Sequence, residues 1–390
     1  MIFFISIGNN FWFSDSIRNF FSLNTNLNFK DIQGYVELRD YRSPSIIYGQ
    51  NYNFNIFRAY LKYKLLTIGD NTISFGRGLS LFLSYDEKAI LESYLRGIVL
   101  EFNKISIYGG IKRKWLYYSS DNDTTYILGS YFQYRFFGVN GLYYKNQDYG
   151  FLTSSYLDFS NFYVEIAYRN GYDIFTFSNN EGYGLFSSIS FFGIKLEYCY
   201  YDKIYESFNL PATINSYGLL SSSARNETGL SLSYAYKNFL AEISRTYDIK
   251  WSKNLLNYYN ISFYNEFSKI RAYRVFSINQ NLDDYVLSLD LKIKSLMGAI
   301  EYRNRKNEAQ PFISVGYIYE FLNIAVNYRR FFNSNKFDYF FELKYDNTKN
   351  MIISIGYGEF SGDIVCSSGI CRYEPPFKGL KSSINFNYSF

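Results

Sequence analysis

One stretch of the chain carries four charged side chains whose spacing could narrow a pore: Arg77, Asp86, Glu92 and Arg96. They lie in the segment FGRGLSLFLSYDEKAILESYLRG, where glycines flank the first arginine and permit backbone shapes that other residues resist. Rings of charged side chains set the selectivity of many channels. We expect residues 76–93 to fold inward, with a short amphipathic helix at 82–93, so that Arg77 pairs with Asp86 or Glu92 at a constriction. An external loop with solvated charges is the alternative.

Two cysteines, Cys366 and Cys371, lie in the segment VCSSGICRY and could form a disulfide. The residues between them can turn a hairpin, and an envelope-exposed loop is oxidising. Two cysteines without histidine nearby make a poor zinc site. We therefore predict a structural disulfide that shapes the tip of a long extracellular loop at 359–379. Cys199 lies apart from this pair, and we expect it to be a small buried residue.

Histidine is absent from the 390 residues, which removes histidine-based catalysis and histidine metal ligands. No other arrangement of residues points to an active site, a metal or a cofactor, so we expect no enzyme activity. The net charge of +5 is spread along the chain without a Lys/Arg-rich run. This pattern argues against nucleic acid as a partner.

A long connection at 202–226 is rich in aromatic residues, among them Tyr205, Phe208 and Tyr217. These rings could stack on sugars that approach from outside. They could also pack the connection over the mouth of a barrel, which is the more ordinary role of such rings. The sequence leaves both possibilities open.

Alternating apolar and polar residues recur along the whole chain and predict antiparallel β-strands. In residues 283–294, for example, Leu287 and Leu289 share one face, whereas Asp290 lies on the other. Aromatic residues make up 22% of the chain, as is typical of the lipid-facing bands of outer-membrane barrels. No run of about 18 apolar residues predicts a transmembrane helix. We predict one all-β domain over residues 1–390, a large antiparallel transmembrane β-barrel.

Tight and long connections alternate along the chain, as short periplasmic turns and longer extracellular loops do in such barrels. The hairpins predict about 22 to 24 strands, with 24 favoured because periplasmic termini require an even number. The first strand is expected at residues 3–13. A barrel this wide is too large for its wall side chains to fill, so a loop, a partner protein or water must occupy the interior.

The closing strand is similar to that of outer-membrane barrels. Its apolar face ends with Ile384, Phe386, Tyr388 and Phe390. In such barrels the terminal aromatic strand is read by the insertion machinery of the outer membrane. The resemblance implies an outer-membrane location, with membrane lipid and that machinery as partners. The N-terminal MIFFISI is too short for a signal peptide, so we expect Met1 to be a clipped, misassigned or mature start.

Three segments resemble an uncharacterised family of outer-membrane β-barrels typical of Bacteroidota-like bacteria. They are YVELRDY at 35–41, SFGRGLSL at 74–81 with SYLRG at 93–97, and VCSSGICRYEPPFKGL at 365–380. The resemblance implies an outer-membrane location and a shared architecture, but no activity.

The pattern of charged inward-facing positions favours a channel or a substrate-specific pore for small polar solutes. The alternative is a non-enzymatic scaffold of the outer membrane, closed by its own loops or by a lipoprotein or periplasmic partner in the lumen. A channel predicts conductance, whereas a scaffold predicts co-purification with a partner.

Overall fold

The structure of the protein is a computed structural model. It describes residues 2–13, 18–42, 52–83, 85–86, 91–115, 125–146, 148–173, 178–206, 208–209, 211–214, 225–277, 282–305, 308–332, 336–347, 351–360, 363–367, 370–374 and 377–389. The regular structure of these residues is entirely β-strand. Within them, no helix is long and apolar enough to cross a membrane.

The strands are mostly nine to fourteen residues long and follow one another with short connections. Their bounds are β1 (Ile2–Phe13), β2 (Arg18–Phe29), β3 (Ile32–Arg42), β4 (Tyr52–Tyr63), β5 (Leu66–Asn71), β6 (Ile73–Phe75), β7 (Leu81–Leu83), β8 (Tyr85–Asp86), β9 (Leu91–Phe102), β10 (Ile105–Trp115), β11 (Thr125–Tyr134), β12 (Phe137–Lys145), β13 (Tyr149–Phe159), β14 (Phe162–Asp173), β15 (Ser178–Phe191), β16 (Ile194–Asp202), β17 (Asn226–Tyr236), β18 (Phe239–Tyr247), β19 (Asn254–Tyr264), β20 (Ser268–Ser277), β21 (Leu282–Ile293), β22 (Leu296–Arg305), β23 (Glu308–Tyr319), β24 (Leu322–Phe331), β25 (Lys336–Asn347), β26 (Met351–Phe360), β27 (Asp363–Ser367), β28 (Ile370–Glu374) and β29 (Phe377–Ser389).

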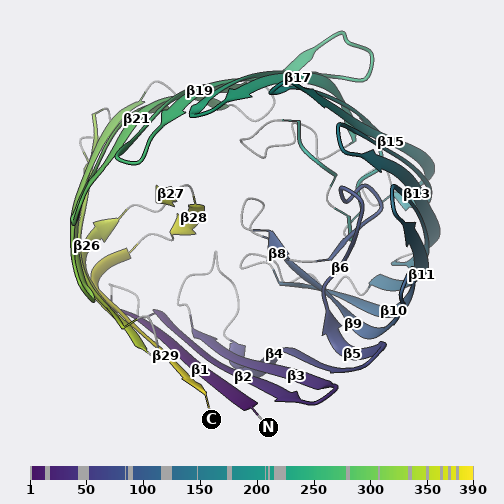
Figure 1. Cartoon of the computed structure of the whole chain (residues 1–390), viewed down its shortest axis with the longest axis horizontal. Helices are drawn as coiled ribbons and strands as arrows, with labels where there is room; N and C mark the ends of the chain where they lie inside the picture. Colours follow the sequence, from purple (N-terminus) through teal and green to yellow (C-terminus); the bar gives the residue numbers. More distant parts are fainter. Residues whose placement is uncertain are drawn as a thin grey trace.

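The strands form a closed barrel, as predicted. One sheet of 25 strands pairs antiparallel throughout, and β1 contacts both β2 and β29, which closes the ring (Figure 1). Without β8, which has only two residues, the sheet has the 24 strands expected from the sequence. Two further two-stranded sheets, β6–β7 and β27–β28, project inside the ring in the view down the barrel axis (Figure 1).

The two faces of the wall differ as the alternating pattern predicts. On β21 the outward side chains of Leu287 and Ile293 are 56% and 57% exposed, whereas the inward Asp284 and Val286 are 2% and 4% exposed. The same alternation holds on β14, where Ile166 faces out and Glu165 faces in. Successive strand residues point to opposite faces, so this register places an apolar band around the outside of the barrel.

The tight turns lie at one end of the barrel, as the alternation of short and long connections predicts. Eight of these turns hold a non-glycine residue at positive φ, which matches the twist of a two-residue hairpin. These residues are Lys30, Lys64, Asn103, Arg135, Phe192, Lys237, Lys294 and Glu320. The longer connections lie at the other end.

Two sequence predictions about connections change in detail. The helix expected at 82–93 is wrong for the described residues, which form β7, β8 and the start of β9. The predicted loop 359–379 contains the hairpin β27–β28. The closing strand β29 lies where it was expected, but the side chains of its last residues and Phe390 lie outside the described part of the chain.

Candidate functional site

The fifth wall strand is interrupted by a hairpin that folds into the barrel. Strand β5 ends at Asn71, residues 73–83 form β6 and β7, and the chain returns to the edge of β9 as β8. Gly69, at φ +114°, lies where β5 leaves β4. Glycine is needed at this position, because a Cβ there would lie 2.2 Å from the carbonyl oxygen of Ala59. The sequence prediction of an inward segment near residue 76 agrees with this course of the chain.

The FGRGL motif forms the tip of the hairpin. Gly76 and Gly78 have φ values of +56° and +86°, which glycine adopts more readily than other residues, and the Gly78 amide donates to the Phe75 carbonyl at 3.0 Å. A Cβ on Gly76 would lie 2.6 Å from Oε2 of Glu165. The glycines therefore permit both the turn and the close approach to the wall.

Glu165, on the inner face of β14, holds the tip. Its Oε2 accepts the backbone N–H of Arg77 at 2.6 Å and the hydroxyl of Tyr163 at 2.7 Å. The side chain of Glu165 is fully buried. The Arg77 guanidinium lies 5.1 Å from the centroid of the Tyr163 ring, a cation–π distance.

A buried polar network attaches the second half of the tip to the wall. Ser80 Oγ lies 2.6 Å from Ser154 Oγ and accepts the side-chain amide of Asn140 at 2.8 Å. The Tyr108 hydroxyl in turn donates to Asn140 Oδ1 at 2.7 Å. All four side chains are buried, so breaking one bond would leave a polar group without a partner.

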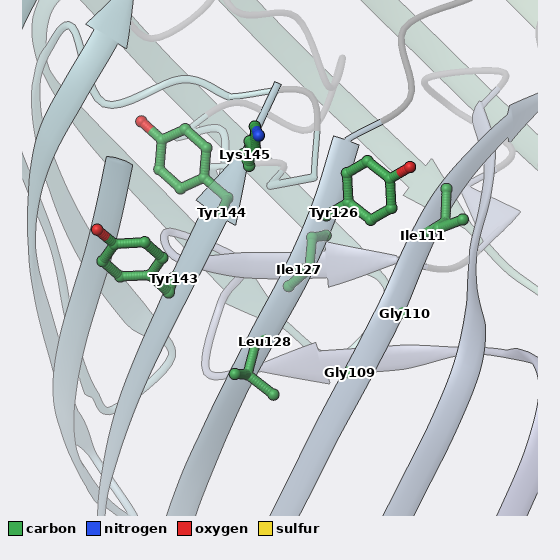
Figure 2. Close-up of a pocket in the computed structure, with 9 residues that line it drawn as sticks. All are labelled: Gly109, Gly110, Ile111, Tyr126, Ile127, Leu128, Tyr143, Tyr144 and Lys145. Atoms are coloured by element: carbon green, nitrogen blue, oxygen red, sulfur yellow. The ribbon is translucent and has the colours of Figure 1, made fainter. Parts of the chain in front are cut away.

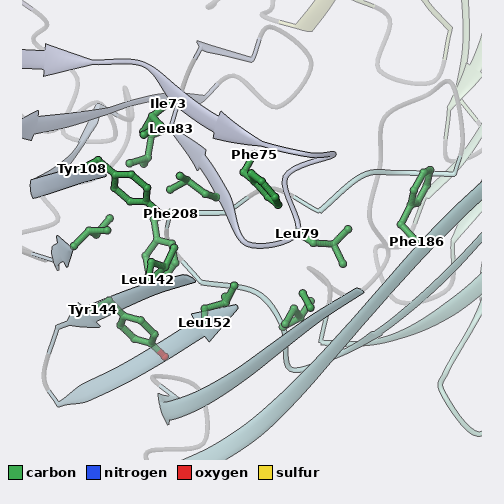
Figure 3. Close-up of a cluster of buried hydrophobic side chains, with 14 of the residues drawn as sticks. Ile73, Phe75, Leu79, Leu83, Tyr108, Leu142, Tyr144, Leu152, Phe186 and Phe208 are labelled. Atoms are coloured by element: carbon green, nitrogen blue, oxygen red, sulfur yellow. The ribbon is translucent and has the colours of Figure 1, made fainter. Parts of the chain in front are cut away.

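Apolar side chains fill the space between the hairpin and the wall. Leu79, Leu81 and Leu83 have no exposed surface, and the Phe75 ring lies 5.8 Å and 5.1 Å from the rings of Tyr131 and Tyr156. Figure 3 shows this cluster between the hairpin and strands of the wall. The barrel therefore has a hydrophobic core on one side of its interior.

A second segment, residues 203–214, lies over the hairpin. The Asn209 side-chain amide donates to the carbonyls of Leu79 and Ile204, at 2.7 Å and 2.9 Å, and the Phe82 amide donates to the Phe208 carbonyl at 2.8 Å. Phe208 is fully buried, and its ring packs 5.0 Å from that of Tyr144. This ring is therefore unavailable for stacking on a sugar. Tyr217 lies outside the described residues.

A buried ion pair anchors this segment to the wall. Arg169 Nε on β14 lies 2.5 Å from Oε1 of Glu206, and the side chains are 1% and 4% exposed. The Tyr144 hydroxyl donates to the same oxygen at 3.2 Å, and Arg169 also donates to the Tyr172 carbonyl at 2.9 Å. Strand periodicity does not predict this pair, because Glu206 lies in the connection between β16 and β17.

Of the predicted constriction residues whose side chains are described, Arg77 lies inside the barrel and Arg96 does not. Arg77 lies inside the barrel, but it packs on Tyr163. Arg96 does not face the lumen: it shares the outer face of β9 with Ile98, and it pairs with Asp70. The strand period explains this error, since Arg96 lies an odd number of positions from the inward residues Leu95 and Val99. The side chains of Asp86 and Glu92 lie outside the described residues.

Accessible ion pairs line the interior near the short-turn end. Three of them join inward residues: Lys62–Glu101 at 2.7 Å, Lys195–Glu197 at 2.5 Å and Lys344–Asp346 at 2.9 Å. Their side chains are 13% to 45% exposed. In these three pairs each cation has an adjacent carboxylate, so they add polar surface to the interior without net charge.

Toward the long-loop end, five consecutive strands from β21 to β25 carry buried polar side chains on their inner faces. They are Asp284, Arg303, Gln310, Arg329 and Asp338, each less than 8% exposed. Arg329 and Asp338 are direct cross-strand neighbours. Strand periodicity predicts polar side chains on the inner face, as for Asp290 on β21, but it does not predict the burial of these five.

Of the two predictions about cysteines, the structure bears out the burial of Cys199 but does not test the disulfide. Backbone pairing places Cys366 directly opposite Cys371 in the β27–β28 hairpin, within the Cα separation that a disulfide requires. Their side chains lie outside the described part of the chain, so the disulfide stays a prediction. Cys199 is a free thiol and is buried, as expected. Among the described residues, no cluster of three or more His, Cys, Asp or Glu could hold a metal ion.

Comparison with known proteins bears on the fold. No protein-family model and no curated protein matches the sequence. Among solved structures, the chain is similar to the translocation pore of the P pilus usher PapC, with a TM-score of 0.50 and 8% identity over 100% of this chain and 99% of that chain. It is also similar to a chain of the E. coli P pilus tip assembly intermediate PapC-PapD-PapK-PapG, with a TM-score of 0.57 and 8% identity over 100% of this chain but only 60% of that chain. At this identity the likeness shows the fold alone, a large β-barrel.

Proposed function

We propose that this protein is an outer-membrane channel, or a substrate-specific pore, for small polar solutes. The apolar outer band, the closed sheet and the likeness to usher barrels support a location in the outer membrane. That location implies membrane lipid and the barrel-insertion machinery as partners. The resemblance to the Bacteroidota-like barrel family remains part of this proposal, and we propose no catalytic role.

The observation that carries the proposal is the apolar packing of two inward segments against one part of the wall. The hairpin 73–83 and the segment 203–214 pack against the wall from β10 to β16. The facing wall presents polar and charged side chains instead. A passage between the two would be narrow and polar, which suits small hydrated solutes better than apolar ones. The balanced ion pairs favour weak selectivity between anions and cations.

Single-channel conductance in a planar bilayer tests the proposal. The intact chain is compared with a variant that lacks residues 73–83, which joins β5 directly to β8 in the wall. A matched control removes residues 249–252 from an outer connection. A steady conductance that rises in the first variant and stays unchanged in the second supports a pore narrowed by the hairpin.

A scaffold closed by its loops or by a partner is the second candidate. The burial of Asp284 and Arg329 near the long-loop end favours it, because an open mouth would leave such charges in water. This alternative predicts no conductance from either the intact chain or the hairpin deletion. It also predicts that a lipoprotein or periplasmic protein is recovered with the barrel after cross-linking.

A further inference from the structure

The short-turn end of the barrel carries positive charge on one side only. Four neighbouring turns, which join β2 to β3, β4 to β5, β9 to β10 and β11 to β12, each contain one exposed cation. These cations, here called the basic arc, are Lys30, Lys64, Lys104 and Arg135. Asp31 is the one acidic residue in the four turns. In the other six short turns that the structure describes, two cations are offset by Glu266 and Glu320.

Backbone hydrogen bonds hold the turns of the basic arc side by side. The Lys64 amide donates to the Asp31 carbonyl at 3.4 Å, and the Glu101 amide donates to the Leu65 carbonyl at 2.8 Å. Neighbouring strands lie about 4.8 Å apart, so successive turns lie about 10 Å apart across the strands. The four cations therefore form a fixed row along one part of the ring, from β2 to β12 (Figure 1).

The first two cations of the row lie against aromatic rings of the outer face. Lys30 Nζ is 5.6 Å from the centroid of the Phe29 ring, and Lys64 Nζ is 5.2 Å from that of Tyr63. Both rings occupy outward positions at the ends of their strands and are 42% and 49% exposed. The ammonium groups are therefore held toward the outside of the barrel and away from its axis.

The other two cations share one ring. Lys104 Nζ and the Arg135 guanidinium lie 4.0 Å and 5.2 Å from the centroid of Tyr134, which has the outward parity of β11. Within the described part of the chain, none of the four cations of the basic arc forms an ion pair with a carboxylate. A cation over a ring keeps its N–H donors available to an anion.

Farther from the turns, the outer face of the same strands is apolar. Figure 2 shows Tyr126, Leu128 and Tyr143 on β11 and β12, beside the backbone of β10 at Gly109. Arg96, on the outer face of β9, is already neutralised by Asp70. The cations of the basic arc instead lie in the turns, where the apolar band ends. Aromatic side chains at this boundary of a membrane protein lie at the level of the lipid head groups.

We propose that the basic arc binds the phosphate groups of anionic lipids in the membrane leaflet at the short-turn end. Its cations are exposed, unpaired with carboxylates and placed at the level of the head groups. An acidic soluble protein would also be attracted by this charge, but the rings hold the cations toward the lipid. The inference rests on the membrane location proposed above. It goes beyond the pore function, because it concerns the outside of the wall and does not depend on conductance.

Two turns of matched sequence provide reporters for a test in reconstituted vesicles. Arg135–Phe136 and Glu320–Phe321 each place a charged residue at a φ of 49° before an exposed phenylalanine. Phe136→Trp therefore reports on the basic arc, and Phe321→Trp reports on an acidic turn of the same shape. Each variant is titrated with brominated phosphatidylglycerol and with brominated phosphatidylcholine, and quenching of the three native tryptophans is measured separately and subtracted.

We expect quenching of the Phe136→Trp reporter to favour phosphatidylglycerol about fivefold. This factor corresponds to about 1 kcal/mol for one cation near a lipid surface. The Phe321→Trp reporter should show no preference for the anionic lipid, because Glu320 repels it. Equal quenching by the two lipids at the Phe136→Trp reporter would overturn the proposal and favour an acidic protein as the partner. An equal preference at both reporters would overturn it too, since the attraction would then come from the charge of the whole barrel.

Second substitutions separate the basic arc from net charge. Lys104→Gln combined with Arg135→Gln should abolish the preference at the Phe136→Trp reporter. Lys237→Gln combined with Lys294→Gln removes the same charge from turns outside the arc, so it should leave the preference unchanged. Equal losses in the two double variants would contradict a local site.

Added salts distinguish a lipid phosphate from a soluble one. Sodium phosphate should weaken the preference no more than sodium chloride of the same ionic strength does. Complete loss in phosphate alone would assign the basic arc to a soluble anion, which overturns the proposal. Absence of quenching by either lipid at both reporters would instead refute the membrane location itself.

Discussion

The backbone nitrogen of Arg77 lies 2.6 Å from Oε2 of Glu165, although 88 positions separate the two residues in the chain. The same oxygen accepts the hydroxyl of Tyr163, the ring of which lies under the Arg77 guanidinium. This buried side chain thus fixes the Arg77 end of the tip against the wall. The width of the proposed passage depends on that contact.

Replacement of this carboxylate should release the hairpin. Glu165→Ala removes the acceptor of two buried hydrogen bonds, which weakens docking of the tip by about 2–3 kcal/mol. We expect single-channel conductance to rise and to fluctuate between levels as the tip detaches. Glu342→Ala, which removes an inward carboxylate on the opposite wall, should leave the conductance level steady. Equal effects of the two substitutions would contradict the anchoring role of Glu165.

A methyl group at the tip should have a related effect. In Gly76→Ala the side chain meets Glu165 Oε2 at 2.6 Å, at a φ of +56° that costs other residues about 1–2 kcal/mol. We expect trypsin to cleave after Arg77 in the folded variant but not in the native protein. Gly141→Ala is the control, since a Cβ at Gly141 has nothing within 4 Å. Resistance of both variants to trypsin would show that the tip stays docked despite the methyl group.

The sequence predicts the wall of this barrel better than its interior. Wall strands have a strict period of two, so residues such as Leu287 and Asp290 reveal their faces without knowledge of their neighbours. The contact between Arg77 and Glu165 joins distant segments, and no local pattern encodes it. The error at Arg96 has the same origin: its charge suggested the lumen, whereas its parity with Ile98 places it on the outer face. The helix predicted at 82–93 failed because pairing with the free edge of β9 outweighed local amphipathicity.

Acid should loosen the connection between β18 and β19. Asp248 accepts hydrogen bonds from the Ser252 hydroxyl, the Lys253 amide and the Ser252 amide, and these bonds lower the pKa of its carboxyl below the ordinary 3.8. Because the pKa is depressed in the folded state, the stabilisation is present above pH 3.8 and is lost as the pH falls below it. The protection of the two amides against hydrogen exchange, measured relative to the intrinsic exchange rate at each pH, should therefore fall in that acidic range. Asp248→Asn should exchange faster at neutral pH and respond less to acid. Equal exchange at neutral pH in the variant and the native protein would contradict this account.

Oxidation should join Cys366 and Cys371. They are direct partners in the β27–β28 ladder, so their backbones are already close enough for a disulfide. Denatured protein should show one alkylated cysteine before reduction and three after it, as read by mass spectrometry. In folded protein, buried Cys199 should resist alkylation under both conditions. Three alkylated cysteines in unreduced, denatured protein would exclude the disulfide.

The ion pair between Arg169 and Glu206 should contribute more to stability than any accessible pair of the interior. Both side chains are almost fully buried, so loss of one partner leaves a charge in a medium that solvates it poorly. Arg169→Met should cost about 3–5 kcal/mol and detach residues 203–214 from the wall. Faster hydrogen exchange at the Glu206 and Asn209 amides would report the detachment, because Glu206 N–H donates to Asn209 Oδ1 only while the segment keeps its fold.

Two further variants separate charge from packing at this pair. Arg169→Met combined with Glu206→Leu removes both charges, so it should be less destabilising than Arg169→Met alone. Lys195→Met breaks the half-exposed pair with Glu197, and it should change the free energy of unfolding by no more than about 1 kcal/mol. A double variant as unstable as the single one would mean that the segment is held by the shape of the two side chains and not by their charges.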